Sequence, residues 1–91
     1  MNRLNPDQLR AKRAEANQLA VSLHVGKLGV NDTVVKELKA QLHKHKLVKV
    51  RLLPSATEGG TTTEAQAQQL ADGADAQLVE IRGHTAVFWR A

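Results

Sequence analysis

Two kinds of hydrophobic spacing alternate along this chain, and their order is what most constrains its fold. Residues 20–25 and 47–53 place apolar side chains at every second position, which is typical of β-strands. Two further apolar segments, 76–82 and 85–90, flank Gly83-His84 and predict a hairpin with a type II′ turn. Helices are expected between these strands and before the first. The order helix, strand, helix, strand, helix, strand, strand predicts an α/β fold in a single two-layer domain over residues 1–91.

Strand direction follows from these connections. A strand, a helix and a second strand usually form a right-handed parallel unit, so the first three strands are expected to be parallel and only the terminal hairpin antiparallel. The predicted sheet is therefore mixed and four-stranded. Within residues 47–53, Lys49 and Arg51 point away from the core side. Phe88 and Trp89 are adjacent and must face opposite ways, one into the core and the other beneath the first helix, with stacking on a base as the alternative role.

Capping residues place the helix boundaries. Asn5-Pro6-Asp7 begins a helix that runs to about residue 17 or 18, and Asn31 or Asp32 caps one that runs to about His45. Thr61-x-x-Glu64 is a candidate capping box for a third helix, which we expect to end near Asp72 with Gly73 as its stop. Residues 54–60 are predicted to be a surface loop.

A glycine turn follows the first strand. Gly26-Lys27-Leu28-Gly29 has the pattern G-x-x-G between a strand and a helix. Glycine lets the main chain adopt positive φ and approach a ligand closely, the next helix offers backbone N–H groups, and Lys27 adds a positive charge. Such a turn can hold a phosphate, although the same pattern also serves as a plain tight connection.

Charge is distributed unevenly. Residues 1–51 hold eleven Lys or Arg and four Asp or Glu, whereas residues 52–91 hold two and five. The basic half contains the glycine turn. A basic surface of this kind attracts polyanions, of which nucleic acid is the commonest partner for a small protein.

The helix after the glycine turn carries a basic stripe. Lys36, Lys39, His43 and Lys46 fall within about 80° of one another at 3.6 residues per turn, and the sequence suggests that no acid interrupts them. Turn and stripe could form one phosphate track. We expect Arg10, Arg13, Lys49 and Arg51 to extend it.

Other functional classes find little support. Cysteine is absent, and His43 and His45 point apart on a helix, so no metal or other cofactor is expected. No acid–base pair or nucleophile can be identified from spacing, so neither an enzyme nor a small-molecule substrate is expected. A membrane-length apolar segment and a signal peptide are also missing, which favours a cytoplasmic protein. We expect it to be a monomer.

Three motifs in order resemble a known family. They are the strand with its G-K-x-G turn, Leu47-Val48-Lys49-Val50-Arg51, and the hairpin Val79 to Arg90 with Gly83-His84-Thr85 at its turn. Together they closely resemble the CRM domain, the chloroplast RNA splicing and ribosome maturation module, which is also known from stand-alone YhbY-like proteins of bacteria and archaea. The resemblance covers nearly the whole chain.

This resemblance implies a non-enzymatic RNA-binding protein. It implies a fold similar to the C-terminal domain of translation initiation factor three, a glycine loop like that of KH domains, and a role with ribosomal RNA in large-subunit assembly. Carried over by position, the loop residues are Gly26, Lys27, Leu28 and Gly29. Leu28 departs from the family, where this place often holds a basic or small polar residue. The alternative is a protein-interaction adaptor with an incidental basic face.

Overall fold

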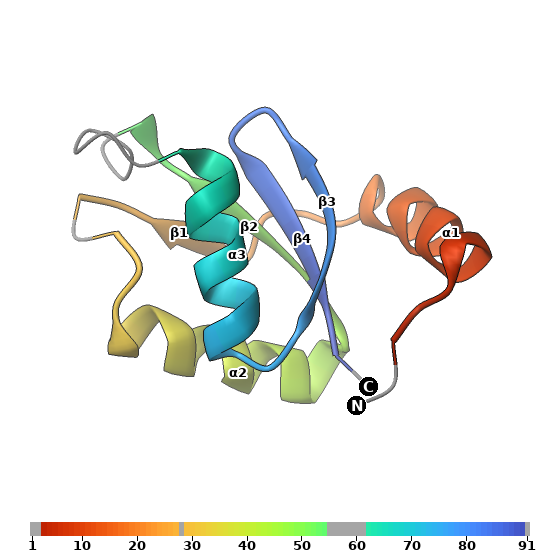
Figure 1. The fold of residues 1–91 in the computed structure, drawn as a ribbon, viewed down its shortest axis with the longest axis horizontal. Coiled ribbons are helices and arrows are strands. Elements are labelled where there is room, and N and C mark those ends of the chain that lie inside the picture. The colour runs from red at the N-terminus through yellow and green to blue at the C-terminus, as the bar shows by residue number, and fades with distance from the viewer. Residues whose placement is uncertain (1–2, 28, 55–61, 91) are drawn as a thin grey trace.

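A computed structural model describes residues 3–27, 29–54 and 62–90 of the chain, which fold into three helices and one four-stranded sheet (Figure 1). The α/β class and the predicted order of elements are confirmed. The elements are α1 (Pro6–Ala16), β1 (Leu23–Val25), α2 (Asp32–His45), β2 (Leu47–Leu52), α3 (Thr63–Gly73), β3 (Gln77–Arg82) and β4 (Thr85–Trp89). Most of the predicted 54–60 loop lies outside the described residues.

The sheet has the order β1-β2-β4-β3, and this differs from the expected pairing. β1 and β2 are parallel as predicted, and β3 and β4 form the antiparallel hairpin. However, β2 does not pair with β3, because β4 lies between them and is antiparallel to both. The physical reason is burial: Ala86, Val87 and Phe88 are all buried, so β4 needs cover on both faces and takes a central place.

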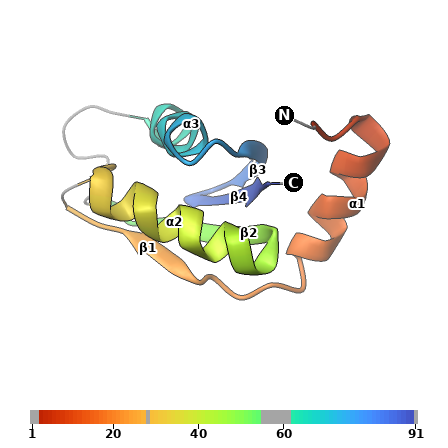
Figure 2. The same cartoon turned by 90° about the horizontal axis from the view of Figure 1, so that it is seen from below.

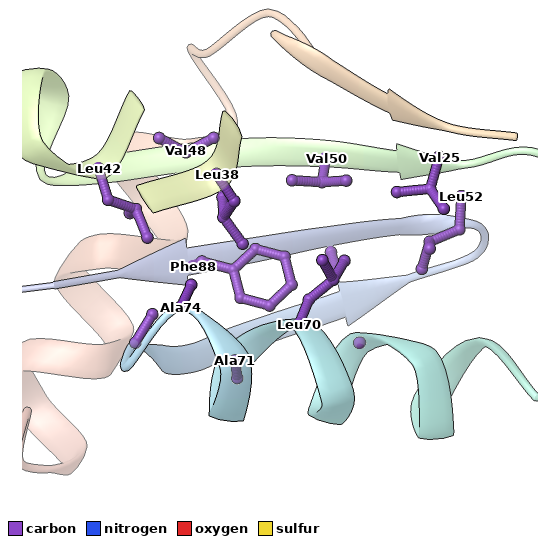
Figure 3. Close-up of a cluster of buried hydrophobic side chains, with 13 residues drawn as sticks. Val25, Leu38, Leu42, Val48, Val50, Leu52, Leu70, Ala71, Ala74 and Phe88 are labelled. Carbon is purple, nitrogen blue, oxygen red and sulfur yellow. The ribbon is translucent and has the colours of Figure 1, made fainter. Parts of the chain in front are cut away.

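Helices α2 and α3 cover one face of the sheet and enclose the main core. Leu38 and Leu42 of α2 and Leu70 of α3 lie around Phe88 of β4, and Val50 of β2 belongs to the same cluster (Figure 3). Phe88 is therefore the aromatic residue that occupies the core. The predicted inward set of Val48, Val50 and Leu52 is fully buried here as well.

Helix α1 packs on the opposite face of the sheet, at one end only, and stands apart from α3 (Figure 2). Ala16 joins the buried residues Leu47, Val79 and Val87 in a second, smaller cluster, and Trp89 packs against it. The expected role of the second aromatic, beneath the first helix, is thus confirmed. The rest of this face has no helix over it in the described part of the chain.

Local signals account for the helix ends, with two corrections. Asn5 and Asn31 cap α1 and α2 as predicted. The cap of α3 is Thr62, whose side chain accepts from the backbone N–H of Ala65, whereas the predicted Thr61 lies outside the described residues. Gly73 lies within α3 instead of stopping it. A Cβ there would come within 3.0 Å of Val35, so glycine serves the close approach of α3 to α2.

Candidate functional site

The glycine turn closes at the carboxyl end of β1. The backbone N–H of Gly29 donates to the carbonyl of Gly26 at 2.9 Å, and Gly29 has a φ of +65°, which favours glycine. The side chain of Gln66 on α3 lies behind Gly29, because a Cβ at Gly29 would be 3.4 Å from its Nε2. Gly26 does not have a positive φ, and a Cβ there would meet only Leu53 at 4.0 Å. Only one of the two glycines is therefore required by the backbone.

An open pocket of about 390 Å³ lies where this turn meets the start of α2. It is lined by Gly26, exposed Lys27, Gly29, Asn31 and residues of the first helical turn. The Asn31 side chain accepts from the N–H of Val34 at 2.9 Å, which leaves the first two N–H groups of α2 without helical partners. Lys27 and the start of α2 thus line one space, and the N-terminus of a helix favours an anionic oxygen.

The basic side chains of α2 extend away from this pocket. Lys36, Lys39 and His43 are exposed, and in the described part of the chain the only basic residues in ion pairs are Arg10 and Lys12. The α2 lysines are therefore available to bind an anion. We call Lys27, Lys36, Lys39 and His43, with the start of α2, the α2 surface.

Two details of the predicted stripe need correction. The helix begins at Asp32, four residues before Lys36, so an acid does lie on the same side at the head of the stripe. At the other end, Lys46 is the C-cap with a φ of 66° and is no longer part of the helix, although its N–H still donates to Leu42. The continuous basic part of the helix therefore runs from Lys36 to His43.

The predicted extensions of the track lie elsewhere. Lys49 and Arg51 point to the face of the sheet opposite α2, because their β2 neighbours Val48 and Val50 belong to the core beneath the helices. Arg10 and Arg13 lie on α1. Arg10 is exposed beside Asp7 at 3.8 Å, and Arg13 donates from Nε to the carbonyl of Val79 at 3.4 Å. The turn and α2 form one surface, which these four residues do not join. Leu28 lies outside the described residues.

Sequence reasoning missed two basic residues beside Lys49 and Arg51. His24 pairs with Arg51, and Arg82 pairs with Thr85, which itself pairs with Arg51. Directly paired strand residues point to the same side of a sheet, so all four basic side chains share the open face. The alternation of residues 20–25 could have placed His24 on this face. The position of Arg82 on the face depends on a β-bulge in β3, which the sequence does not indicate.

Sites of other kinds are not seen in residues 3–27, 29–54 and 62–90. No three metal-binding side chains gather there, and none of the helices is long and apolar enough to cross a membrane.

Comparisons with known proteins agree with these features. A family model described as the CRS1 / YhbY (CRM) domain matches residues 4–90. A Bacillus subtilis (strain 168) protein named probable RNA-binding protein YqeI is 33% identical over 87 residues, which cover 96% of this chain and 88% of the relative. A Methanocaldococcus jannaschii protein, also named a probable RNA-binding protein, is 35% identical over 81 residues. That match covers 89% of this chain and 59% of the longer relative.

A solved structure has the same fold. The solution structure of a hypothetical protein from Staphylococcus aureus superposes with a TM-score of 0.79 and 24% sequence identity, and the match covers 98% of this chain and 90% of that one.

Proposed function

The chain belongs to the CRS1 / YhbY (CRM) domain family and is an RNA-binding protein, and we propose that it holds structured ribosomal RNA on the α2 surface. The observation that carries this proposal is the meeting of the glycine turn, the start of α2 and the free lysines on one side of the molecule. In this role the protein assists assembly of the large ribosomal subunit without catalysing a reaction.

The geometry supports phosphate contacts in preference to base reading. Backbone N–H groups at a helix start and flexible lysine ammonium groups recognise phosphate oxygens and carry no sequence information. The two aromatic residues cannot form a stacking platform here, because Phe88 is fully buried and Trp89 packs beneath α1. Recognition by shape and backbone is typical of structured RNA, whose bases are already paired.

A charge-reversal pair on α2 tests this proposal. Lys39 and Lys44 are both exposed, but five residues place them about 140° apart around the helix. We expect Lys39→Glu to weaken binding to a folded fragment of large-subunit ribosomal RNA and to lower the slope of log affinity against log salt by about 1. Lys44→Glu changes the net charge equally and should have a much smaller effect. If both variants lost the same RNA affinity, binding would depend on the net charge of the protein and not on the position of Lys39.

A second pair tests the glycine turn itself. Gly26→Ala fits the backbone, so it should leave thermal unfolding unchanged while a Cβ obstructs a phosphate that approaches the main chain. Gly29→Ala should lower stability by about 1 kcal/mol, because alanine resists positive φ. Full RNA affinity in the folded Gly26→Ala variant would remove the turn from the binding site.

The assembly role is tested in cell extracts. We expect the protein to sediment with precursors of the large subunit on sucrose gradients, and nuclease treatment should release it. Retention after nuclease digestion would instead favour the protein-interaction adaptor.

A further inference from the structure

The face of the sheet that α2 and α3 leave open carries its own group of basic side chains. Lys49, Arg51, Arg82 and His24 point to this side, and we call these four residues the open sheet face. The strand pairing also brings one acid, Glu80, to this side, since Glu80 is paired with Val87. The sheet separates these charges from the α2 surface, so one straight stretch of RNA backbone cannot follow both.

A cavity opens in the middle of the open sheet face. It has a volume of about 170 Å³ and lies between the segment that follows α1 and strands β2, β4 and β3. Its apolar lining comes from Leu19, Val21 and Val87. Its polar lining includes the acid Glu80 as well as Lys49, Arg82 and Thr85.

Arg82 is exposed at this cavity and makes one hydrogen bond there. Its Nη1 donates to Asn17 Oδ1 at 3.2 Å, and Asn17 lines the same cavity. A guanidinium plane can stack on a base, and aliphatic side chains can pack against the other parts of a base. Lys49 lines the cavity and Arg51 lies two residues further along β2, a step of about 6.7 Å, where both can reach phosphates on either side of that base.

We propose that the open sheet face binds a single-stranded RNA segment, with one base stacked on Arg82 in the cavity and its flanking phosphates on Lys49 and Arg51. The inference rests on the proposed RNA binding and adds a second surface with a different RNA class. Paired bases cannot enter a cavity of this kind, whereas an unpaired base presents both its face and its edges. The protein therefore bridges a structured element on the α2 surface and a single strand on the opposite side.

Two labelled RNAs separate the surfaces. Fluorescence anisotropy with a 12-nucleotide oligouridine and with a closed hairpin gives affinities for each protein variant. We expect Arg51→Glu with Arg82→Glu to weaken oligouridine binding about tenfold and hairpin binding less than threefold. Lys36→Glu with Lys39→Glu changes the charge equally and should show the reverse pattern. The neutral pair Arg51→Gln and Arg82→Gln tests the same contacts without charge reversal, and circular dichroism confirms that each variant is folded.

The outcomes are distinct. If both double variants weaken both RNAs equally, the surfaces are not separate and the inference is overturned. It is also overturned if the open-face variants retain full oligouridine affinity, and the face would then suit an acidic protein segment. If the α2 variants leave hairpin binding unchanged, the proposed function of α2 fails while the open sheet face can still be confirmed.

Simultaneous binding is the last requirement. A donor-labelled hairpin and an acceptor-labelled oligouridine should show energy transfer only with the native protein present, and excess unlabelled oligouridine should not displace the hairpin. Mutual displacement of the two RNAs would show a single site and would refute bridging.

Discussion

The two faces of the sheet differ in how they are used. On the face beneath α2 and α3, thirteen of the described residues form one continuous buried cluster, and the strand residues among them are all apolar. On the other face, Leu47, Val79 and Val87 pack against Ala16 of α1, and further strand positions carry polar side chains, among them Lys49, Arg51 and Arg82. A small domain has one modest core, so one face supplies most of the stability and leaves the other available for binding. The predictions below test this division.

The largest effect is expected from Leu70→Ala. Leu70 is fully buried between α3 and the sheet, so removing its side chain leaves a cavity that costs about 3–4 kcal/mol. Urea unfolding followed by circular dichroism measures this loss. If Leu70→Ala lowered the free energy of unfolding by less than Leu9→Ala does, the proposed division between the two faces would be wrong.

Leu9→Ala is the matched change on the other face. Leu9 lies on α1, is partly buried and packs against the smaller cluster, so the same truncation should cost about 1 kcal/mol. The same urea titration provides the comparison. Equal losses for Leu9 and Leu70 would mean that α1 is as much a part of the core as α3.

Asn5→Ala should cost about 1 kcal/mol, because it removes a capping box. Asn5 Oδ1 accepts from the backbone N–H of Gln8 at 2.8 Å, and Gln8 Oε1 accepts from the backbone N–H of Asn5 at 2.9 Å. We expect hydrogen exchange to increase in α1 while the amides of β2 and β4 remain protected. Increased exchange throughout the sheet would show that α1 does not unfold separately.

Lys46→Gly should produce the smallest effect, a gain of about 0.5 kcal/mol. Lys46 has a φ of 66°, which costs a side-chain-bearing residue more than it costs glycine, although glycine also makes the unfolded chain more flexible. Lys46→Ala removes the same charge without relieving the backbone and serves as the control. Thermal unfolding should rank glycine above alanine, and the opposite ranking would exclude backbone relief as the cause.

Local structure could be predicted well because the signals are local. The spacing of Val48, Val50 and Leu52 fixed which side of β2 faces the core, and Asn5 and Asn31 marked the starts of two helices. The shortness of β1 could not be predicted, because residues 20–22 continue its apolar alternation but lie outside the strand. In that region Ser22 is hydrogen bonded to Gln41 of α2, a contact between distant segments.

Sheet order and the second basic face depend on long-range contacts. The apolar run from Ala86 to Trp89 indicates a strand that is buried on both faces and therefore central in the sheet. The rule that a strand, a helix and a strand form a parallel pair pointed instead to β3 as the neighbour of β2. The bulge between Leu78 and Glu80 left no recognisable mark in the sequence. Without it, strict alternation from Leu78 would turn Arg82 toward the helices and Ile81 toward the open face. The glycine turn and the exposed α2 lysines, by contrast, could be placed from local pattern alone.

The central position of β4 has a consequence during synthesis. β2 is complete when Leu52 has been added, yet its antiparallel partner is not finished until Trp89, and β3 pairs only with that same late strand. Without β4, β1 and β2 can form only a two-stranded ribbon with an unpaired edge, and such a ribbon is marginally stable in water. We therefore expect the sheet to close in one late step after Trp89 has left the ribosomal exit tunnel.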